Sequence, residues 1–261
     1  MRKREKAIYL AGVAIATALF VVATRSDLRF EVEHDVSETQ AVSDVPVFRI
    51  SDYDSIFRVY ADTIGWDWKM LAAVAYVESK FDTSAVSSVG AQGLMQIMPQ
   101  TARAMGVPEG MEHNPEESVR AAVEYFEYLS HLFRRVPEGE RINFVLASYN
   151  AGFGHVHDAM RLAHKYGKNR YVWNDNVETY LRLKNDSIYF TDSLCRNGRF
   201  IATETILFVR RVQHKYGEFR LLEEEFVHQQ LASTAHKMAI LMRKKCPITY
   251  SEGVWGEFLL V

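Results

Sequence analysis

The 261-residue sequence has little that would indicate a disulfide-stapled, redox or nucleic-acid-binding protein. It contains two cysteines, Cys195 and Cys246, and neither has a nearby cysteine or histidine at metal-ligand spacing. The pair leaves two alternatives open, a disulfide in an oxidising compartment or two unpaired thiols. With 31 basic and 33 acidic residues the formal net charge is −2, so no overall charge attracts the chain to nucleic acid or to an anionic membrane.

One long stretch lacks charge altogether. Residues 1–6 carry four basic side chains, and residues 7–24 are apolar or small and uncharged. At about 1.5 Å per helical residue, this stretch is just long enough to span a bilayer, and no clear small-x-small cleavage site follows it. We expect residues 1–27 to be a signal peptide or a transmembrane anchor, with a slight preference for an inner-membrane anchor through residues 7–24. Because basic residues precede the stretch, the rest of the chain is expected in the cell envelope, on the periplasmic or extracytoplasmic side, anchored or secreted.

The next segment, residues 28–48, has several acidic residues, no helical apolar stripe and no basic residue after Arg29, so it is expected to be a solvated linker. From about residue 50 onward, apolar residues recur at helical spacing and strand-like alternation is scarce. No internal repeat is present. We therefore expect a mainly α-helical globular domain over residues 49–215, followed by a C-terminal helical extension over residues 216–261.

Several helix boundaries can be predicted. Asn114 and Pro115 have the character of an N-cap and a first helical residue, and two glutamates follow them. A second helix through residues 144–149 should break in the turn at residues 150–154, and a third should run over residues 155–166. Pro99 is expected to open a short helix that ends near Gly106.

A glutamate on an apolar helix face is the first candidate for chemistry. Leu71, Val74, Ala75 and Glu78 occupy positions i, i+3, i+4 and i+7 of a helix, so Glu78 lies on the side that faces the core. Partial desolvation there would favour the neutral acid and raise its pKa, as a general acid near neutral pH requires. The plain alternative is a glutamate at the edge of the stripe that pairs with a lysine or arginine.

Three boxes, in order and at fitting spacing, decide between these alternatives. They are Glu78-Ser79, the segment Gly93-Leu94-Met95-Gln96-Ile97 with Pro99 and Thr101-Ala102, and the segment Ala147-Ser148-Tyr149-Asn150-Ala151-Gly152. Together they resemble the soluble-lytic-transglycosylase (SLT) domain over roughly residues 50–215. The resemblance implies a lysozyme-like helical fold.

The resemblance also implies a function. Glu78 would protonate the β-1,4 bond between N-acetylmuramic acid and N-acetylglucosamine of peptidoglycan, then act as base while a 1,6-anhydro ring closes. Ser79, Gln96, Met95, Tyr149 and Asn150 would line the glycan cleft, where Gly90 and Gly93 would let the loop approach a sugar closely. No metal and no organic cofactor is implied. Expected partners are peptidoglycan glycan strands and proteins of cell-wall synthesis or remodelling, and not nucleic acid.

The chain departs from the family pattern in two places. Ser148 stands where the family usually has alanine. A fourth element, commonly Glu-Thr followed by Tyr-Val, resembles the segment from Glu204 to Val209 with Phe208 in place of tyrosine, and an alternative alignment begins at Glu178. Glu204 is expected to hold helices together rather than to perform chemistry.

Two other functions remain as alternatives to the lytic transglycosylase. A lysozyme-like hydrolase could cleave the same bond with a comparable glutamate, and product chemistry would separate the two enzymes. A non-catalytic peptidoglycan-binding envelope protein could keep the cleft, although such a groove has no need of a desolvated acid.

Overall fold

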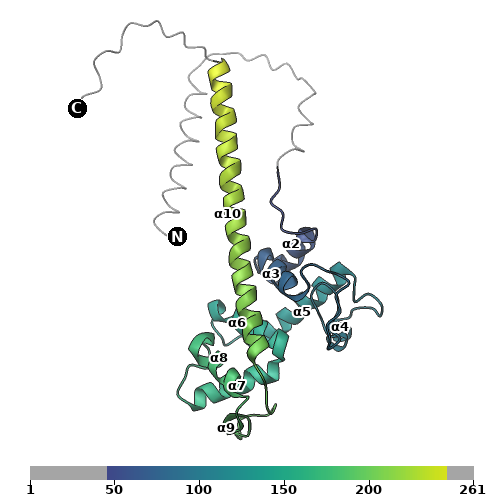
Figure 1. Cartoon of the computed structure of the whole chain (residues 1–261), viewed down its shortest axis with the longest axis vertical. Coiled ribbons are helices and arrows are strands. Elements are labelled where there is room, and N and C mark those ends of the chain that lie inside the picture. The colour runs from purple at the N-terminus through teal and green to yellow at the C-terminus, as the bar shows by residue number, and fades with distance from the viewer. Residues whose placement is uncertain (1–45, 246–261) are drawn as a thin grey trace, which may run out of the picture. The chain divides into compact units, whose positions relative to one another are not determined.

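The computed structural model of the chain describes residues 46–245 (Figure 1). The expected signal or anchor, nearly all of the expected linker and Cys246 lie outside these residues. Within them the chain is helical, and paired backbone is limited to isolated bridges. The helices are α2 (Asp54–Thr63), α3 (Trp68–Ser79), α4 (Pro99–Ala104), α5 (Pro115–Leu132), α6 (Glu138–Ala151), α7 (Phe153–Lys165), a π-helical turn η2 (Trp173–Val177), α8 (Glu178–Leu183), α9 (Ser187–Phe190) and α10 (Thr203–Lys245).

The helix starts follow the predicted local chemistry. The Asn114 side chain caps α5 by accepting a hydrogen bond from the Glu117 backbone N–H at 3.0 Å, and Pro115 begins the helix. Pro99 opens α4, as expected. The prediction of both helix starts is confirmed. It succeeded because a cap and a first-turn proline depend only on residues close together in the sequence.

The turn between α6 and α7 is tighter than predicted. Gly152, at φ +85°, is both the residue that ends α6 and the residue that precedes α7. A single glycine can take this conformation without a Cβ clash, so the chain changes direction in one residue instead of five. For that reason α7 begins at Phe153, two residues before the predicted start.

The core forms where the helices pack side by side. Helix α10 packs on α3 and α6, α2 packs on α3 and α5, and α7 packs on both α6 and α8. The middle of α3, from Leu71 to Ala75, is completely buried. Because the middle of α3 is buried on every side, the position of its last turn, which contains Glu78, is fixed by packing.

Helix α10 differs from the others in length and exposure. It runs without interruption through the expected boundary between residues 215 and 216. Its first part is buried through residues such as Val212 and Phe219, whereas large apolar side chains further along, including Leu231 and Met238, are exposed. In the described part of the chain, residues 46–245, none of the helices is long and apolar enough to cross a membrane.

Candidate active site

Glu78 lies in the last turn of α3, which ends at Ser79. Its side chain is half-buried, and no group among residues 46–245 forms a hydrogen bond or an ion pair with its carboxyl. Burial raises the pKa of Glu78 from 4.5 to about 8. The negative end of the helix dipole acts in the same direction, because it disfavours a carboxylate at this position. At neutral pH the group is therefore an acid with a proton to give.

The chain turns sharply directly after Glu78. Lys80 and Phe81 both have positive φ, 54° and 68°, a conformation that non-glycine residues seldom adopt. Such conformations cost free energy and cluster at functional sites. Here they let α3 stop immediately beyond the acid and send the chain into the loop that precedes α4.

Ser79 ties that loop to α3. Its hydroxyl lies 3.1 Å from the Ala75 carbonyl oxygen on its own helix and 2.8 Å from the Leu94 carbonyl oxygen in the loop. A hydroxyl has one proton, so the two carbonyl groups share it. The Ser79 side chain thus fixes the loop beside Glu78.

Gln96 occupies a strained position in the same loop, with φ +50°. Its side-chain Nε2 donates to the carbonyl oxygens of Ala85 at 3.0 Å and Gly93 at 2.9 Å. Both amide hydrogens are used in holding the loop. The Oε1 acceptor has no donor among the described residues, so it is the part of this half-buried side chain that remains for a ligand.

Gly93 has a different role from the one expected. A Cβ on Gly93 would lie 2.3 Å from the Glu112 carbonyl oxygen, and the residue has φ +73°. The close approach that only glycine permits is therefore to the protein's own main chain before α5. A Cβ on Gly90 would meet nothing within 4 Å.

Met95 connects the loop to two helices through its backbone. Its N–H donates to the Ser118 hydroxyl at 3.1 Å, and its carbonyl oxygen accepts a hydrogen bond from the Tyr149 hydroxyl at 2.7 Å. The Met95 side chain is completely buried. The residue contributes to the shape of the wall from inside the core.

Tyr149 is near Glu78 and is held by rings and by one hydrogen bond. Its ring packs at 4.7 Å from that of Phe126 and 5.8 Å from that of Tyr125. Burial, followed by the negative charge of Glu78, raises the pKa of the Tyr149 hydroxyl well above 10. The hydroxyl therefore stays protonated and donates to Met95.

Asn150 is exposed at the end of α6. Its Oδ1 accepts a hydrogen bond from the buried Thr205 hydroxyl of α10 at 2.7 Å. Thr205 belongs to the fourth motif element, but neither it nor Ser118 could be assigned from the sequence as a support of the site. A lone hydroxyl has no periodic signal, and both partners lie more than twenty residues away along the chain.

The two glutamates that could begin the fourth element differ in their contacts. The Glu204 side chain is 77% exposed and pairs loosely, at 3.8 Å, with Arg211 of the same helix, so the prediction that it holds helices together is wrong. Glu178 is buried at the start of α8 and accepts a hydrogen bond from Arg210 of α10 at 2.6 Å. The glutamate that joins two helices is the one that begins the alternative alignment. Phe208 is buried, 5% exposed, and packs in the core.

A pocket of about 430 Å³ lies between α3 and α10, and some of the residues that line it are close to Glu78 along the chain. It is lined by Tyr76 and Val77 of α3 and by Lys80 just beyond the helix end, and basic residues of α10 face them; Glu78 itself is not a lining residue. Helix α10 therefore forms one side of a hollow beside the turn that holds the acid.

Comparison with known proteins agrees with this arrangement. The sequence profile described as "Transglycosylase SLT domain" matches residues 55–172, a range that includes Glu78, the loop of Gln96 and the turn at Asn150. Residues 55–172 therefore form a domain of the transglycosylase SLT family.

Two similar curated proteins carry the same name, membrane-bound lytic murein transglycosylase F. The one from Marinobacter nauticus is 37% identical over 169 residues, which cover 64% of this chain and 33% of that protein. The one from Photobacterium profundum is 33% identical over 198 residues, which cover 74% of this chain and 37% of that protein. This chain therefore spans about a third of the length of such relatives.

Among solved structures, the 70 kDa soluble lytic transglycosylase from Escherichia coli aligns with 66% of this chain and 24% of its own. The identity is 25% and the TM-score is 0.44. The family assignment accordingly depends on the sequence match.

Proposed function

We propose that the protein is a peptidoglycan lytic transglycosylase, which cleaves the β-1,4 bond between N-acetylmuramic acid and N-acetylglucosamine. The observation that carries the proposal is Glu78: an unpaired, half-buried acid with a pKa of about 8, inside a transglycosylase SLT domain. The curated relatives are named for the same activity on murein.

One carboxyl group is enough for the proposed reaction. Protonated Glu78 gives its proton to the glycosidic oxygen as the bond to C1 of the muramyl residue breaks. The muramyl N-acetyl group stabilises the cation. Glu78, now a carboxylate, takes the proton of the muramyl C6 hydroxyl while that oxygen bonds to C1, which closes the 1,6-anhydro ring and restores the acid. A pKa near 8 suits a group that must both give and take a proton near neutral pH.

The electrostatics of Glu78 support a mechanism with a single acid. Glycosidases that use two carboxyl groups hold them about 5–9.5 Å apart, where each would raise the pKa of the other. Burial alone accounts for the raised pKa of Glu78, and no other carboxylate contributes to it within the described chain.

The other candidate site residues fall into two groups: those whose polar groups bond within the protein, and those with a polar group free to contact the substrate. Ser79, Met95 and Tyr149 use their polar groups on the protein and fix the wall of the site. Gln96 keeps its Oε1 acceptor, and Asn150 keeps its amide donor because Thr205 occupies only its Oδ1. An acceptor and a donor together suit the N–H and C=O of a sugar acetamido group.

We also propose that the protein lies in the cell envelope. The relatives are named membrane-bound, and residues 1–27 have the sequence of a signal peptide or anchor. Proteins of cell-wall synthesis or remodelling remain its proposed partners. Carbonate extraction of membranes tests the anchor: the full chain should stay in the membrane fraction, and its release would indicate a cleaved signal.

Mass spectrometry of muropeptides released from purified sacculi tests the activity. The parent chain and the matched control Glu109→Gln, an exposed change in the same domain, should both release products that carry 1,6-anhydromuramic acid, whereas Glu78→Gln should release none. Reducing-end products would instead identify a hydrolase. No release by any variant would indicate a binding protein.

A further inference from the structure

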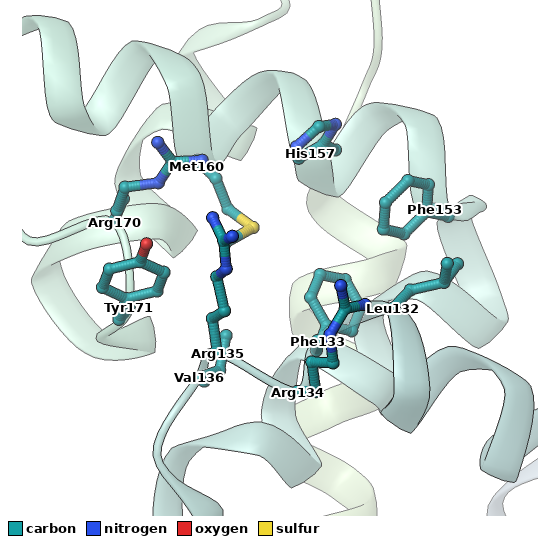
Figure 2. Close-up of a pocket in the computed structure, with 10 residues that line it drawn as sticks. All are labelled: Leu132, Phe133, Arg134, Arg135, Val136, Phe153, His157, Met160, Arg170 and Tyr171. Carbon is teal, nitrogen blue, oxygen red and sulfur yellow. The ribbon is translucent and has the colours of Figure 1, made fainter.

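A second hollow lies among the segment that follows α5, helix α7 and the segment before η2 (Figure 2). Its volume is about 300 Å³. None of its lining residues is a candidate for glycan contact. They are Leu132, Phe133, Arg134, Arg135, Val136, Phe153, His157, Met160, Arg170 and Tyr171.

Three arginines converge on this hollow without a compensating acid. Figure 2 shows that the Arg134 and Arg135 side chains rise from the segment between α5 and α6 toward α7, and that Arg170 reaches into the same space. No aspartate or glutamate lines the hollow, and none of the three arginines pairs with a carboxylate of residues 46–245. Like charges held together destabilise the fold unless an anion joins them.

Arg170 carries a second sign of a missing partner. Its Nε is buried, and nothing in the described chain accepts a hydrogen bond from it. Its guanidinium lies 5.4 Å from the Tyr171 ring centroid, which holds the group at the wall. Buried donors in proteins are almost always satisfied, so this one points to an acceptor that comes from outside the described chain.

His157 adds a neutral donor. Arg161 lies with its guanidinium nitrogen 2.7 Å from His157 Nδ1, and because a guanidinium can only donate, Nδ1 is the acceptor. The hydrogen of the neutral ring then sits on Nε2. The His157 ring stacks on Phe153 at 5.1 Å, so polar and apolar walls meet on one face of α7.

The walls suggest what kind of anion would bind. Phe153 and Met160 line the same hollow as the three arginines and give it an apolar wall. A planar carboxylate fits the arginine fork with two parallel hydrogen bonds, and the space is at the small end of ligand pockets. A free inorganic anion would leave the apolar wall unused.

We propose that this arginine pocket binds the terminal carboxylate of a short peptide, whose last side chain packs against Phe153 and Met160. A peptidoglycan stem peptide, which ends in an alanine carboxylate, has this chemistry; that choice of source rests on the proposed function, whereas the carboxylate specificity does not. The pocket would hold the peptide of a strand and thereby direct the enzyme to strands that bear free stem peptides.

Isothermal titration calorimetry on the purified full chain tests the proposal. The probes are the stem tetrapeptide L-Ala-γ-D-Glu-meso-diaminopimelate-D-Ala, the same peptide amidated at the last carboxyl, an unrelated peptide ending in a free D-alanine carboxylate, and inorganic phosphate. We expect the free acid to bind, and both amidation and Arg135→Gln to weaken binding about tenfold or more. The matched control Arg103→Gln, an exposed arginine of α4, should bind as the parent does.

The possible results of this experiment separate failure of the carboxylate pocket from failure of its assignment to peptidoglycan. Equal binding of acid and amide, an unchanged affinity in Arg135→Gln, or no binding of either free-acid peptide would overturn the proposal. Binding of phosphate with neither peptide would make the pocket a general anion site and also overturn it. If the unrelated peptide binds and the stem peptide does not, the carboxylate pocket stands and its assignment to peptidoglycan is wrong. Glu78→Gln should keep peptide affinity, so loss of the anhydro products would leave this result unaffected.

Discussion

Two acids in this protein, the half-buried Glu78 and the completely buried Asp158, have opposite surroundings. Glu78 has no partner among the described residues, and burial raises its pKa to about 8. Asp158 of α7 is completely buried, yet it receives hydrogen bonds from Lys184 at 2.6 Å, from the backbone N–H groups of Arg196 at 3.1 Å and Asn197 at 2.9 Å, and from Arg161. Burial alone would raise its pKa, but these partners lower it to about 2.

The difference separates a reactive acid from a structural one. The fold satisfies Asp158 fully and so uses it to clasp the segment that joins α9 to α10. It leaves Glu78 unsatisfied, at a cost in stability that a purely structural position would not retain. The predictions below test this contrast from its largest consequence to its smallest.

Glu78→Gln should abolish activity without harming the fold. A general acid contributes about 10²–10⁴-fold to rate, and glutamine keeps the shape while losing the proton. Muropeptide release measures the first effect and thermal unfolding the second. A variant that lost activity and unfolded early would place Glu78 with Asp158 as a structural acid.

Asp158→Asn should lower the free energy of unfolding by about 3–5 kcal/mol, because Lys184, itself completely buried, would be left without its counter-charge. Urea denaturation measures the loss. In the double variant with Lys184→Met much of the stability should return, since the completely buried charge of Lys184 is no longer present. A single variant as stable as the parent would show that the clasp carries no net stability.

The pH dependence of stability should differ in sign for the two acids. The folded pKa of Glu78 is raised, so the folded state holds its proton more tightly, and stability falls as pH rises from about 4.5 to 8. Relative to Glu78→Gln, the parent should lose a few kcal/mol across this window, at about 1.36 kcal/mol per pKa unit. Asp158 has a lowered pKa, so its contribution is present above about pH 4 and is lost as pH falls toward 2. Urea midpoints at several pH values give both slopes, and parallel curves for parent and Glu78→Gln would contradict the raised pKa.

Tyr149→Phe should lower the free energy of unfolding by about 1–2 kcal/mol, because the Met95 carbonyl oxygen loses its donor at 2.7 Å. The same change should reduce activity, since the loop beside Glu78 loses one attachment. Unfolding curves and muropeptide yields measure the two effects. Unchanged stability would mean that the hydroxyl does not hold the loop.

Ser148→Ala, one residue earlier, should have the opposite sign. The Ser148 side chain is completely buried, and its hydroxyl has no hydrogen-bond partner among the described residues. Replacing it with the alanine that the family usually has should raise the free energy of unfolding by about 1 kcal/mol. Calorimetric melting detects a shift of this size, and a lower melting temperature would show that the hydroxyl is satisfied in solution.

The sequence was informative where a signal is local or periodic. The Asn114 cap, the Pro99 helix start and the position of Glu78 on the apolar face of α3 all follow from residues within two helical turns of one another. The mainly helical fold and the family could be predicted for the same reason, since the three boxes are continuous segments.

Pairings across the chain could not be predicted in this way. Asp158 and Lys184 are 26 residues apart, and neither spacing nor composition indicates that a lysine will be buried against that aspartate. The sequence also could not show which motif residues hold the loop and which are free for a ligand, because a hydroxyl or amide in a motif can face either the ligand or the protein. Glu204 and Glu178 could not be ranked correctly, since only packing decides which of two glutamates meets Arg210.

The Asp158 clasp also determines where a protease would cut. The segment between α9 and α10 contains exposed arginines, including Arg196 and Arg199, and the Asp158 carboxyl accepts hydrogen bonds from the backbone N–H groups of Arg196 and Asn197. Trypsin should therefore leave the parent intact there and nick Asp158→Asn. A nick at this point would separate α10 covalently from the helices before it, while its packing on α3 and α6 would still keep the two fragments together.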